Sequence, residues 1–474
     1  YVPDRTACSL TKSITKFQEE YEMNLQGKKV LVFGTGKSGI GAADLLKQTG
    51  AHVILFDGNE KTDKAAVLNK LANAQNVEIY AGELPEEVVN NLDLVVLSPG
   101  VPTDIPVVKN FYEHKIPVWG EVELAYRTGK GRVLAITGTN GKTTTTALLG
   151  KIMADAEDSV FVVGNIGTPY TSKSPEMKEN STTVAEISSF QLETIDEFAP
   201  QVSAILNITE DHLNRHHTME EYIRVKELIV KNQKPEDYCI LNYEDPVLRE
   251  FGKNIVPKTV YFSSVRKLDE GIYLDGDLIV LRTADEEIPL VHTGELKLLG
   301  QHNFENVMAA SAMAYYAGVS VESIRKSICE FTAVEHRIEY VTEKNGVAYY
   351  NDSKGTNPDA AIKGIQAMNR PTLLIGGGYD KGSSYDEWLN AFDGKVRYLV
   401  LIGQTREKIK EAAERLGVCP NIVLCEDLKE AVEFCAQKAE PGDAVLLSPA
   451  CASWGQFDNY EQRGDMFKEY VKAL

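Results

Sequence analysis

A short glycine-rich segment with a lysine and a run of threonines carries the strongest chemical signal in the chain. It reads "GTNGKTTT" from Gly138, follows the apolar run "GRVLAITG" and precedes "TTTALLGKIM", which has helical periodicity. A strand, a glycine loop and a helix in this order are typical of a phosphate-binding loop, because inward-facing N–H groups and the helix N-terminus attract phosphate. An ordinary turn before a helix is the simpler alternative, but the combined context favours phosphate binding.

The loop departs from the most familiar phosphate-loop pattern at one position. GxxxxGK[ST] would need glycine where the chain has Ile136, so the usable core is GxxGKT starting at Gly138. In this interpretation Lys142 reaches the terminal phosphates of a nucleotide, and the hydroxyl of Thr143 ligates Mg²⁺.

Further metal ligands are expected at the carboxyl ends of neighbouring strands. Glu186 ends the apolar run "TTVAE", and Asp211 and His212 follow "VSAILNI". Such oxygen-rich positions suit magnesium. A zinc site is the alternative, because His212 and His216 are four residues apart, with His217 adjacent. These histidines have no cysteine or carboxylate partner at metal-ligand spacing, which favours magnesium.

A second glycine motif lies near the start of the chain. "GTGKSG", residues 34–39, follows the apolar run "KKVLVF", and Asp57 ends the next apolar run. GxGxxG with a downstream acid is typical of dinucleotide binding, which makes a nicotinamide-dependent oxidoreductase one hypothesis. That hypothesis leaves the GKTTT loop and Glu186 unexplained. A helix N-terminus also suits other diphosphates, whatever nucleoside they carry.

Composition excludes several classes of protein. The chain has 474 residues, 43% hydrophobic and 25% charged, with a net charge of −19. This composition is globular, and the negative charge argues against nucleic acid as a partner. The apolar runs are too short to span a bilayer, so no membrane association is expected. Seven cysteines without a CxxC pair fit reduced thiols in the cytoplasm.

Apolar β-branched runs alternate with helix-length segments, which predicts an α/β fold of three domains with parallel sheets. We expect a Rossmann-like N-terminal domain, a central P-loop ATPase-like domain with a mainly parallel sheet, and a Rossmann-like C-terminal domain. The string "GIYLDGDLIVLR" predicts a hairpin turning at Asp275-Gly276. The expected boundaries are 1–26 for an extension or leader, 27–120 for the N-terminal domain, 121–333 for the central domain and 334–474 for the C-terminal domain.

Together these motifs resemble the Mur ligases, the ATP-dependent amide-forming enzymes of peptidoglycan precursor synthesis. The resemblance runs from about residue 28 to the C-terminus and rests on "GTNGKT", "GNIG", "NITEDHL", "GQHNFEN", "EHRIEYV" and "NDSKGTN". "SSFQLE", and "SPACAS" followed by "YEQRG", are similar to the branch that adds D-glutamate to UDP-N-acetylmuramoyl-L-alanine. The DNPR signature of the diamino-acid-adding branch is absent.

The resemblance implies catalytic and metal-binding roles. The implied catalytic residues are Lys142, Glu186, His212 and Lys226, and the implied ligands of two Mg²⁺ ions are Thr143, Glu186, His212 and Lys226. Lys226, in "YIRVK", aligns with the family's carbamylated lysine; a free ammonium would repel Mg²⁺, whereas its CO₂ adduct is an anionic ligand. A solvated helix lysine is the alternative for this residue.

The resemblance also implies three sets of binding residues. ATP would be bound by Gly138, Thr139, Asn140, Gly141, Lys142, Thr143, Thr144, Asn303, Asn306, Arg337, Asp352 and Lys354. The UDP substrate would be bound by Gly36, Lys37, Ser38, Asp57, Ser98, Gly100, Asn165, Ser188 and Gln191. D-Glutamate would be bound by Thr356, Lys381, Ser453 and Tyr460. Asn303 could instead cap its helix, Asp352 could simply end its strand, and Tyr460 stands where the family often has phenylalanine.

Several alternatives remain at this level. Another amino-acid ligase of the same superfamily is the nearest, such as a different Mur ligase or a folylpolyglutamate synthase. The first glycine loop and the "SPACAS…QRG" combination argue against the folate enzyme. A regulatory nucleotide-binding protein without chemistry is disfavoured by the full set of expected catalytic residues. We expect a cytoplasmic monomer that acts on small molecules.

Overall fold

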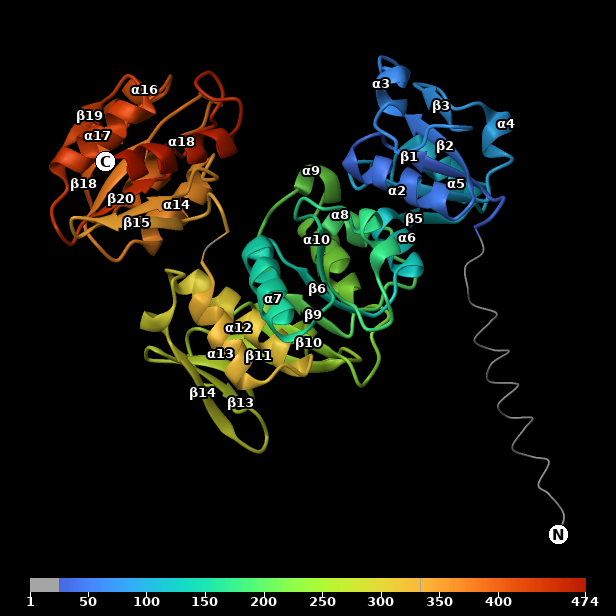
Figure 1. The fold of residues 1–474 in the computed structure, drawn as a ribbon, viewed down its shortest axis with the longest axis horizontal. Coiled ribbons are helices and arrows are strands. Elements are labelled where there is room, and N and C mark those ends of the chain that lie inside the picture. Colours follow the sequence, from blue (N-terminus) through green and yellow to red (C-terminus); the bar gives the residue numbers. More distant parts are fainter. Residues whose placement is uncertain (1–24, 333) are drawn as a thin grey trace, which may run out of the picture. The chain divides into compact units, whose positions relative to one another are not determined.

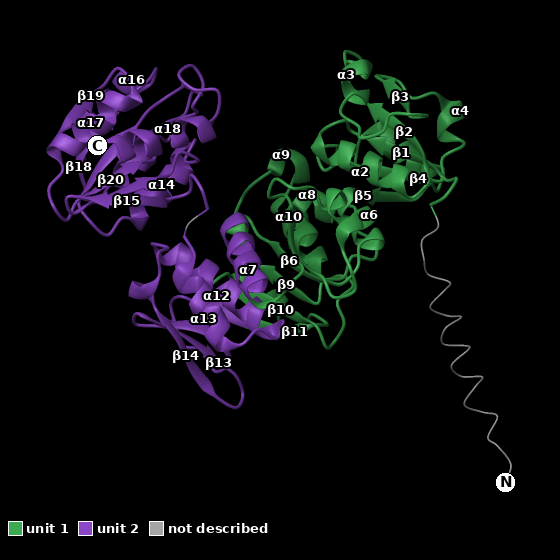
Figure 2. Cartoon of the chain, in the orientation of Figure 1, with its two compact units in different colours: residues 1–142, 156–260 green, residues 143–155, 261–474 purple. Residues whose placement is uncertain are grey.

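The computed structural model describes residues 25–332 and 334–474, so most of the expected extension (1–26) and Cys8 lie outside the described residues. The chain forms two units (Figure 2). One contains residues up to 142 together with 156–260, and the other contains 143–155 together with 261–474. Three sheets, each with its own helices, make up the α/β fold that the sequence predicts (Figure 1).

The first sheet has five strands in the order β3-β2-β1-β4-β5, all parallel. Its strands are β1 (Lys29–Phe33), β2 (His52–Asp57), β3 (Glu78–Ala81), β4 (Leu94–Leu97) and β5 (Val118–Gly120). Its helices are α2 (Lys37–Gln48), α3 (Lys64–Leu68), α4 (Glu86–Val89), α5 (Pro106–Glu113) and α6 (Glu121–Thr128). Apolar side chains of β1 are buried on both faces, which explains why the strand reads as an unbroken apolar run.

The second sheet has nine strands in the order β14-β13-β12-β11-β10-β9-β6-β8-β7. The strands from β10 to β7 are parallel, whereas β12 to β14 pair antiparallel, so the sheet is mixed. Its strands are β6 (Arg132–Thr137), β7 (Val160–Gly164), β8 (Thr182–Glu186), β9 (Val202–Ile205), β10 (Tyr238–Asn242), β11 (Lys258–Ser263), β12 (Gly271–Asp275), β13 (Leu278–Arg282) and β14 (Glu287–His292). The expected hairpin is confirmed, but Asp275 pairs with Leu278, so the turn is Gly276-Asp277.

The helices of this central part are of unequal length. They are α7 (Lys142–Ala156), α8 (Ser189–Leu192), α9 (Leu213–His216), α10 (Met219–Glu227), α11 (Pro246–Phe251), α12 (Gln301–Tyr316) and α13 (Val321–Glu330). α7 and α12 are the longest, at 15 and 16 residues, and both bury most of their apolar side chains. The shortest, α8 and α9, carry motif residues and lie at the carboxyl ends of strands.

The third sheet has six strands in the order β15-β16-β20-β17-β18-β19, parallel apart from the β15–β16 pair. Its strands are β15 (Glu339–Lys344), β16 (Val347–Asn351), β17 (Thr372–Gly376), β18 (Val396–Leu401), β19 (Ile422–Leu424) and β20 (Ala444–Leu447). Its helices are α14 (Pro358–Ala367), α15 (Asp386–Asn390), α16 (Arg406–Leu416), α17 (Leu428–Lys438) and α18 (Tyr460–Ala473). Two apolar clusters cover its two faces.

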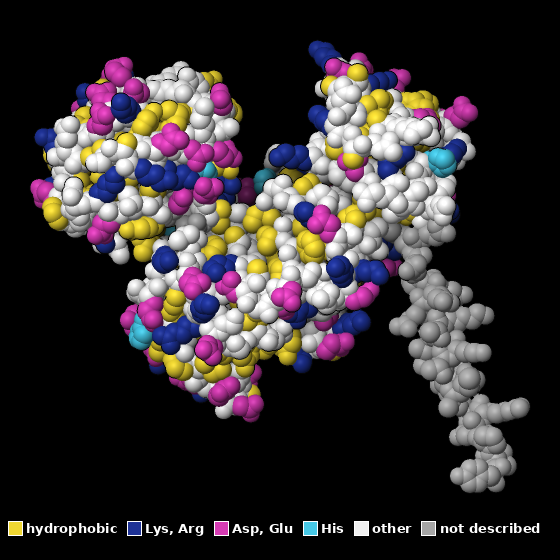
Figure 3. Space-filling view, viewed as in Figure 1, with side chains coloured by type: hydrophobic (Ala, Val, Ile, Leu, Met, Phe, Trp, Pro, Cys, Tyr) yellow, Lys and Arg dark blue, Asp and Glu magenta, His cyan; other side chains and the backbone are white. Residues whose placement is uncertain are grey.

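Global features agree with the composition. The six cysteines among the described residues are free thiols. Within the described part of the chain, no helix is both long enough and apolar enough to cross a bilayer. Acidic and basic side chains are interspersed on the face drawn in Figure 3.

A fully buried carboxylate joins α6 to the loop that leaves α8. Glu123 Oε2 accepts from the backbone N–H groups of Asp196 and Phe198 at 2.8 and 3.0 Å, and its Oε1 accepts from that of Glu197 at 2.9 Å. Arg127 Nε also donates to Oε1, at 2.6 Å. These four hydrogen-bond partners are all donors, and a carboxylate accepts from all of them.

We predict that Glu123→Gln lowers the free energy of unfolding by roughly 1–3 kcal/mol, because the new amide NH₂ faces N–H donors and leaves them unpaired. Urea unfolding followed by circular dichroism measures the change. Glu87→Gln, at an exposed position of α4, is the control and should not shift the midpoint. An unchanged midpoint for Glu123→Gln would contradict this role.

Candidate active site

The phosphate loop closes tightly between β6 and α7. Gly138 and Gly141 have φ angles of 143° and 87°, which favour glycine. The Asn140 N–H donates to Asn207 Oδ1 at 2.8 Å, and the Thr139 N–H donates to the Asn207 carbonyl at 2.9 Å. Lys142 Nζ bends back and donates to the carbonyl oxygens of Gly138 and Thr139 at 2.9 and 3.0 Å. The segment after β9 therefore holds the loop in shape.

Glu186 lies at the same sheet edge as this loop. β6 and β8 pair in parallel with Ile136 opposite Glu186, so the carboxylate stands where β6 runs into the loop. Its Oε1 accepts from Asn165 Nδ2 at 2.7 Å. Its Oε2 is buried and has no hydrogen-bond partner among the described residues. A buried anionic oxygen without a partner is costly, and a bound cation would compensate it.

Lys226 also reaches the loop. Its side chain is buried on α10, and Nζ donates to the Gly138 carbonyl at 2.9 Å and lies 4.7 Å from the Tyr222 ring. Burial, and secondarily the charge of Lys142, lower the pKa of Lys226 to about 7. The solvated-lysine alternative is therefore wrong, because the amine is buried.

Among the described residues, the three histidines do not come together as a group of metal ligands; each lies near a different carboxylate, that of Asp211, Glu193 or Asp104. His212 is exposed, has φ 53°, and its ring lies 4.9 Å from that of Phe190. His216 is buried, with Nε2 3.0 Å from Ser189 Oγ, and burial lowers its pKa. His217 Nε2 lies 3.1 Å from an Asp104 carboxylate oxygen.

One group of metal-ligand type does converge among the described residues: Glu335, His336 and Asp465. Lys468 Nζ lies 2.7 Å from Glu335 and 3.1 Å from Asp465, so an ammonium already balances the two carboxylates. The sequence did not single out this cluster as a metal site, and the lysine makes it an ion-pair network.

The first glycine loop ends β1 and begins α2, as expected. A Cβ on Gly39 would lie 1.9 Å from the Gly34 carbonyl oxygen, so only glycine allows this turn. Gly36 is the N-cap residue and makes no side-chain cap bond. Six predicted residues lie at or just after the carboxyl ends of three strands of this sheet: Gly36, Lys37, Ser38, Asp57, Ser98 and Gly100. Asp57 accepts from Thr35 Oγ1 at 2.5 Å and from the Asn59 N–H at 3.0 Å, which orients it towards its own loop.

The other three predicted UDP-substrate residues are held by internal hydrogen bonds. Asn165 is bonded to Glu186, as above. Gln191 Oε1 accepts from the N–H and Oγ of Ser188 at 2.8 and 3.0 Å, and its Nε2 donates to Glu121 Oε1 at 2.8 Å. Burial raises the pKa of Glu121 to about 7. In this structure Gln191 orders the Ser188 turn through its side chain; the sequence missed Glu121, which has no motif of its own.

Asn303 and Asn306 lie on α12 beside α7. Asn306 Oδ1 accepts from Thr145 Oγ1 at 3.2 Å, and its Nδ2 donates to Asn303 Oδ1 at 3.2 Å. Asn303 Nδ2 donates to the Leu299 carbonyl at 2.7 Å. The capping alternative for Asn303 is wrong, because Gly300 is the N-cap residue and Asn303 lies within the helix.

Asp352 follows β16 and is buried. Burial raises its pKa to about 7, although Ser448 Oγ donates to it at 2.7 Å and the exposed Arg337 is nearby. Lys354 Nζ lies 5.2 Å from the Tyr460 ring. Thr356 is half-buried just before α14. These residues therefore share one end of the third sheet.

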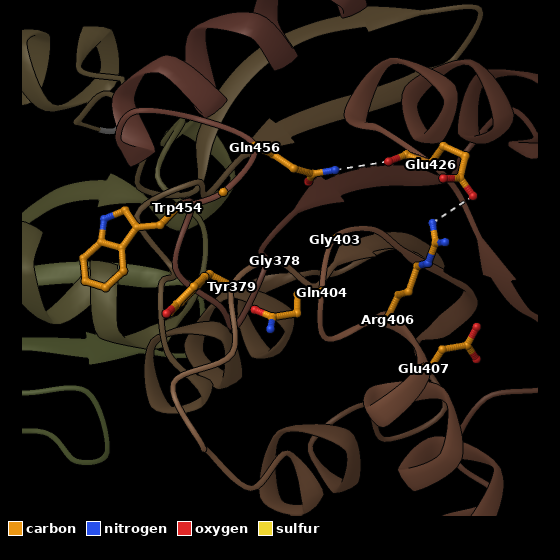
Figure 4. A pocket seen from close by; sticks show the side chains of 10 residues that line it. Gly378, Tyr379, Gly403, Gln404, Arg406, Glu407, Glu426, Trp454 and Gln456 are labelled. Carbon is orange, nitrogen blue, oxygen red and sulfur yellow. Dashed lines mark hydrogen bonds and ion pairs between the residues drawn. The ribbon is translucent and has the colours of Figure 1, made fainter.

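A pocket of about 630 Å³ opens at this same end, above β17, β18 and β19 (Figure 4). Trp454 and Tyr379 pack edge to face at 5.6 Å on one side, while Arg406 is paired with Glu426 on the other. Lys381 Nζ lies 5.0 Å from the Trp454 ring, and Ser453 is the buried neighbour of Trp454. The sequence identified Lys381 and Ser453 but missed the lining residues Tyr379, Gln404, Arg406 and Trp454.

Gly164 fixes the approach of β7 to the Glu186 backbone. Its φ is 99°, and an added Cβ would lie 2.2 Å from the Glu186 carbonyl oxygen, a backbone atom that cannot move aside. Gly167 has φ 101° but an open Cβ position, so it is a matched control for backbone strain alone.

We predict that Gly164→Ala destabilises the protein by about 1–3 kcal/mol more than Gly167→Ala. Urea midpoints measure the difference, and equal midpoints would contradict the steric role.

Comparison with known proteins gives matches along nearly the whole chain. Residues 28–120 match the Mur ligase MurD-like N-terminal domain, residues 136–314 the Mur ligase middle domain, and residues 336–451 the glutamate ligase domain of Mur ligases. The UDP-N-acetylmuramoylalanine–D-glutamate ligase of Lachnoclostridium phytofermentans is 58% identical over 95% of this chain and 99% of its own length. The ligase of the same name from Lachnospira eligens is 55% identical over 95% of this chain and 100% of its own.

Solved structures agree on the fold. The UDP-N-acetylmuramate–alanine ligase MurC of Thermotoga maritima aligns with a TM-score of 0.57 at 19% identity, covering 94% of this chain and 99% of that one. The MurF ligase of Thermotoga maritima in complex with ADP aligns with a TM-score of 0.56 at 18% identity, covering 95% and 97%.

Proposed function

The chain belongs to the Mur ligase family, and from that membership we propose that it joins D-glutamate to UDP-N-acetylmuramoyl-L-alanine at the expense of ATP, in peptidoglycan precursor synthesis. The alanine carboxylate attacks the γ-phosphorus of ATP, ADP leaves, and an acyl phosphate forms. The amino group of D-glutamate then attacks the acyl carbon, phosphate leaves, and the nitrogen loses a proton. The observation that carries this proposal is the agreement in sequence, at 58% identity over 95% of the chain, with a ligase of that name.

The proposed ATP residues include the loop from Gly138 to Thr144. Lys142 and the loop N–H groups offset the negative charge that gathers on the transferred phosphoryl group, and preorganised donors of this kind act without reorganising. Asn303 and Asn306 are assigned to the adenine, and Arg337, Asp352 and Lys354 to the phosphates and ribose. The buried side chain of Asn306 accepts a hydrogen bond from Thr145 Oγ1, and this bond holds the Asn306 amide in one orientation.

The residues at the loop fit a hard cation. Glu186 Oε2 is a buried oxygen in need of a positive partner, and the Thr143 hydroxyl follows Lys142 at the start of α7. We assign Thr143, Glu186, His212 and the modified Lys226 to two Mg²⁺ ions. When bound, magnesium offsets charge as the carboxylate and the triphosphate approach each other.

The remaining residues are assigned to the two other substrates. Gly36, Lys37, Ser38, Asp57, Ser98 and Gly100 would hold the UDP group, with Asn165, Ser188 and Gln191 nearer the acceptor carboxylate. Thr356, Lys381, Ser453 and Tyr460 would hold D-glutamate, with Lys381 pairing a carboxylate. The corresponding domains would be 27–120, 121–333 and 334–474. One chain carries all three sets, so we propose a monomer that works in the cytoplasm.

Supplying ATP, Mg²⁺ and UDP-N-acetylmuramoyl-L-alanine and screening amino acids for phosphate release tests the activity. D-Glutamate alone should respond. Lys142→Ala should lower the rate by about 10²–10³-fold with an unchanged circular dichroism spectrum, because it removes a transition-state charge partner. Lys151→Ala, on the same helix but outside the loop, is the control. Coupled product with ATP left intact, or release with every amino acid, would overturn the proposal.

We also propose that Lys226 carries a carbamate. Carbamate formation needs an uncharged amine that attacks CO₂, and a pKa of about 7 leaves a large uncharged fraction at neutral pH. Because the pKa of Lys226 is lowered, the uncharged fraction grows as pH rises through about 7 and is lost below it. The adduct would turn a cation beside Lys142 into an anionic oxygen ligand.

¹³C NMR of protein equilibrated with ¹³C-bicarbonate should show one carbamate carbon that is absent from Lys226→Arg and present in Lys234→Arg, which alters an exposed lysine. The signal should weaken as the pH falls below about 7. Activity in CO₂-depleted buffer should drop and recover on adding bicarbonate. A carbamate signal that survives Lys226→Arg would assign the adduct to another lysine.

A further inference from the structure

One largely buried ion pair in the first unit links two segments of the second sheet and contacts a loop of the first sheet. Arg215 donates to Glu193 through Nε at 3.1 Å and through Nη2 at 2.6 Å. Both side chains are nearly buried, with 11% and 10% of their surfaces exposed. The guanidinium also lies 5.0 Å from the Phe190 ring. The pair is therefore bidentate, and the Phe190 ring contacts the guanidinium from a third side.

The same pair holds a loop of the N-terminal sheet. Arg215 Nη2 also donates to the carbonyl of Val101 at 2.9 Å, and Thr103 Oγ1 donates to Glu193 Oε2 at 3.3 Å. Val101 and Thr103 belong to the loop that follows β4. That loop begins with Ser98 and Gly100, which border the first glycine loop. Ser98 Oγ donates to the Gly34 carbonyl at 3.4 Å.

At its other end the pair contacts the central motifs. Glu193 is the C-cap residue of α8, the helix of "SSFQLE" that begins just after Glu186 and contains Gln191. Arg215 lies on α9, whose N-cap residue is His212. A single side-chain pair therefore ties together the loop after β4, the α8 motif and the histidine segment.

Energetic considerations indicate that the pair specifies geometry more than it adds stability. Two charges removed from water lose about as much hydration as they gain in attraction, so a buried pair is poor support for stability alone. A bidentate guanidinium, however, fixes distance and angle, which a lysine ammonium does not. Glu193 ends the "SSFQLE" motif, but the sequence analysis assigned no role to it or to Arg215.

We propose that Arg215 and Glu193 are positioning residues that couple the loop bordering the UDP crevice to the segments carrying Glu186 and His212. They hold the acceptor end of the UDP-linked substrate in register with the phosphate loop. This inference rests on the proposed function of Ser98, Gly100 and His212. It adds a coupling element that touches neither substrate nor metal.

Steady-state kinetics of Arg215→Lys, with each substrate varied in turn, tests the coupling. The variant keeps the charge but loses the bidentate pair, so it should raise the KM for UDP-N-acetylmuramoyl-L-alanine roughly tenfold and lower kcat by a similar factor. The KM values for ATP and D-glutamate should stay within about twofold. Arg224→Lys is the matched control: Arg224 forms a bidentate pair with Glu221 three residues earlier on the exposed face of α10, and its replacement should change none of these values.

Thr103→Val provides a second variant that leaves the ion pair intact and removes only the hydroxyl of the loop. It should raise the same KM about threefold with an unchanged melting temperature, a selective effect that a merely structural role would not produce. Equal changes in all three KM values, or a lower melting temperature without a selective KM change, would overturn the coupling. Wild-type protein that forms no product would instead refute the proposed function.

Discussion

The Gly138 carbonyl oxygen accepts hydrogen bonds from two lysine side chains, and these bonds hold the phosphate loop in its conformation. Lys142 reaches it from within the loop, and Lys226 reaches it from α10, each at 2.9 Å. Two cations this close repel each other, and the repulsion adds to burial in lowering the pKa of Lys226. In the proposed function, the triphosphate of ATP and a carbamate on Lys226 would each bring negative charge to this position.

The strand register places Glu186 at the sheet edge where the phosphate loop begins. The parallel register of β6 with β8 sets Glu186 opposite Ile136, and the parallel register of β7 with β8 sets Gly164 opposite Glu186. Parallel strands end at one edge, so residues far apart in sequence converge there without any special folding of the loops. The conformational freedom of Gly164 then lets the backbone of β7 pass close to the Glu186 carbonyl.

Much of this was predictable from the sequence, and the missing parts have a common cause. Apolar runs identified most parallel strands, but β3 was missed because it has only four residues and begins with a glutamate. The motif residues were found at strand ends, since glycine, lysine and acidic residues have local signatures. Glu121, Arg215 and Trp454 have no local signature, and their roles come from partners 70 to 114 residues away. Such pairings arise only from tertiary packing.

Two buried glutamates differ in what surrounds their carboxylate groups. Glu121 and Glu186 each have one carboxylate oxygen without a hydrogen-bond partner among the described residues. Glu121 lies at the start of α6 with Gln191 as its donor, and burial raises its pKa to about 7, so a proton can neutralise it. Glu186 lies at the sheet edge where β6 runs into the phosphate loop, with Asn165 as its donor. In the proposed site, a bound cation would offset the charge of both this carboxylate and the phosphates of ATP. Glu121, which is bonded to Gln191, therefore has a structural role, whereas Glu186 lies next to the phosphate loop and is the one we propose as a metal ligand.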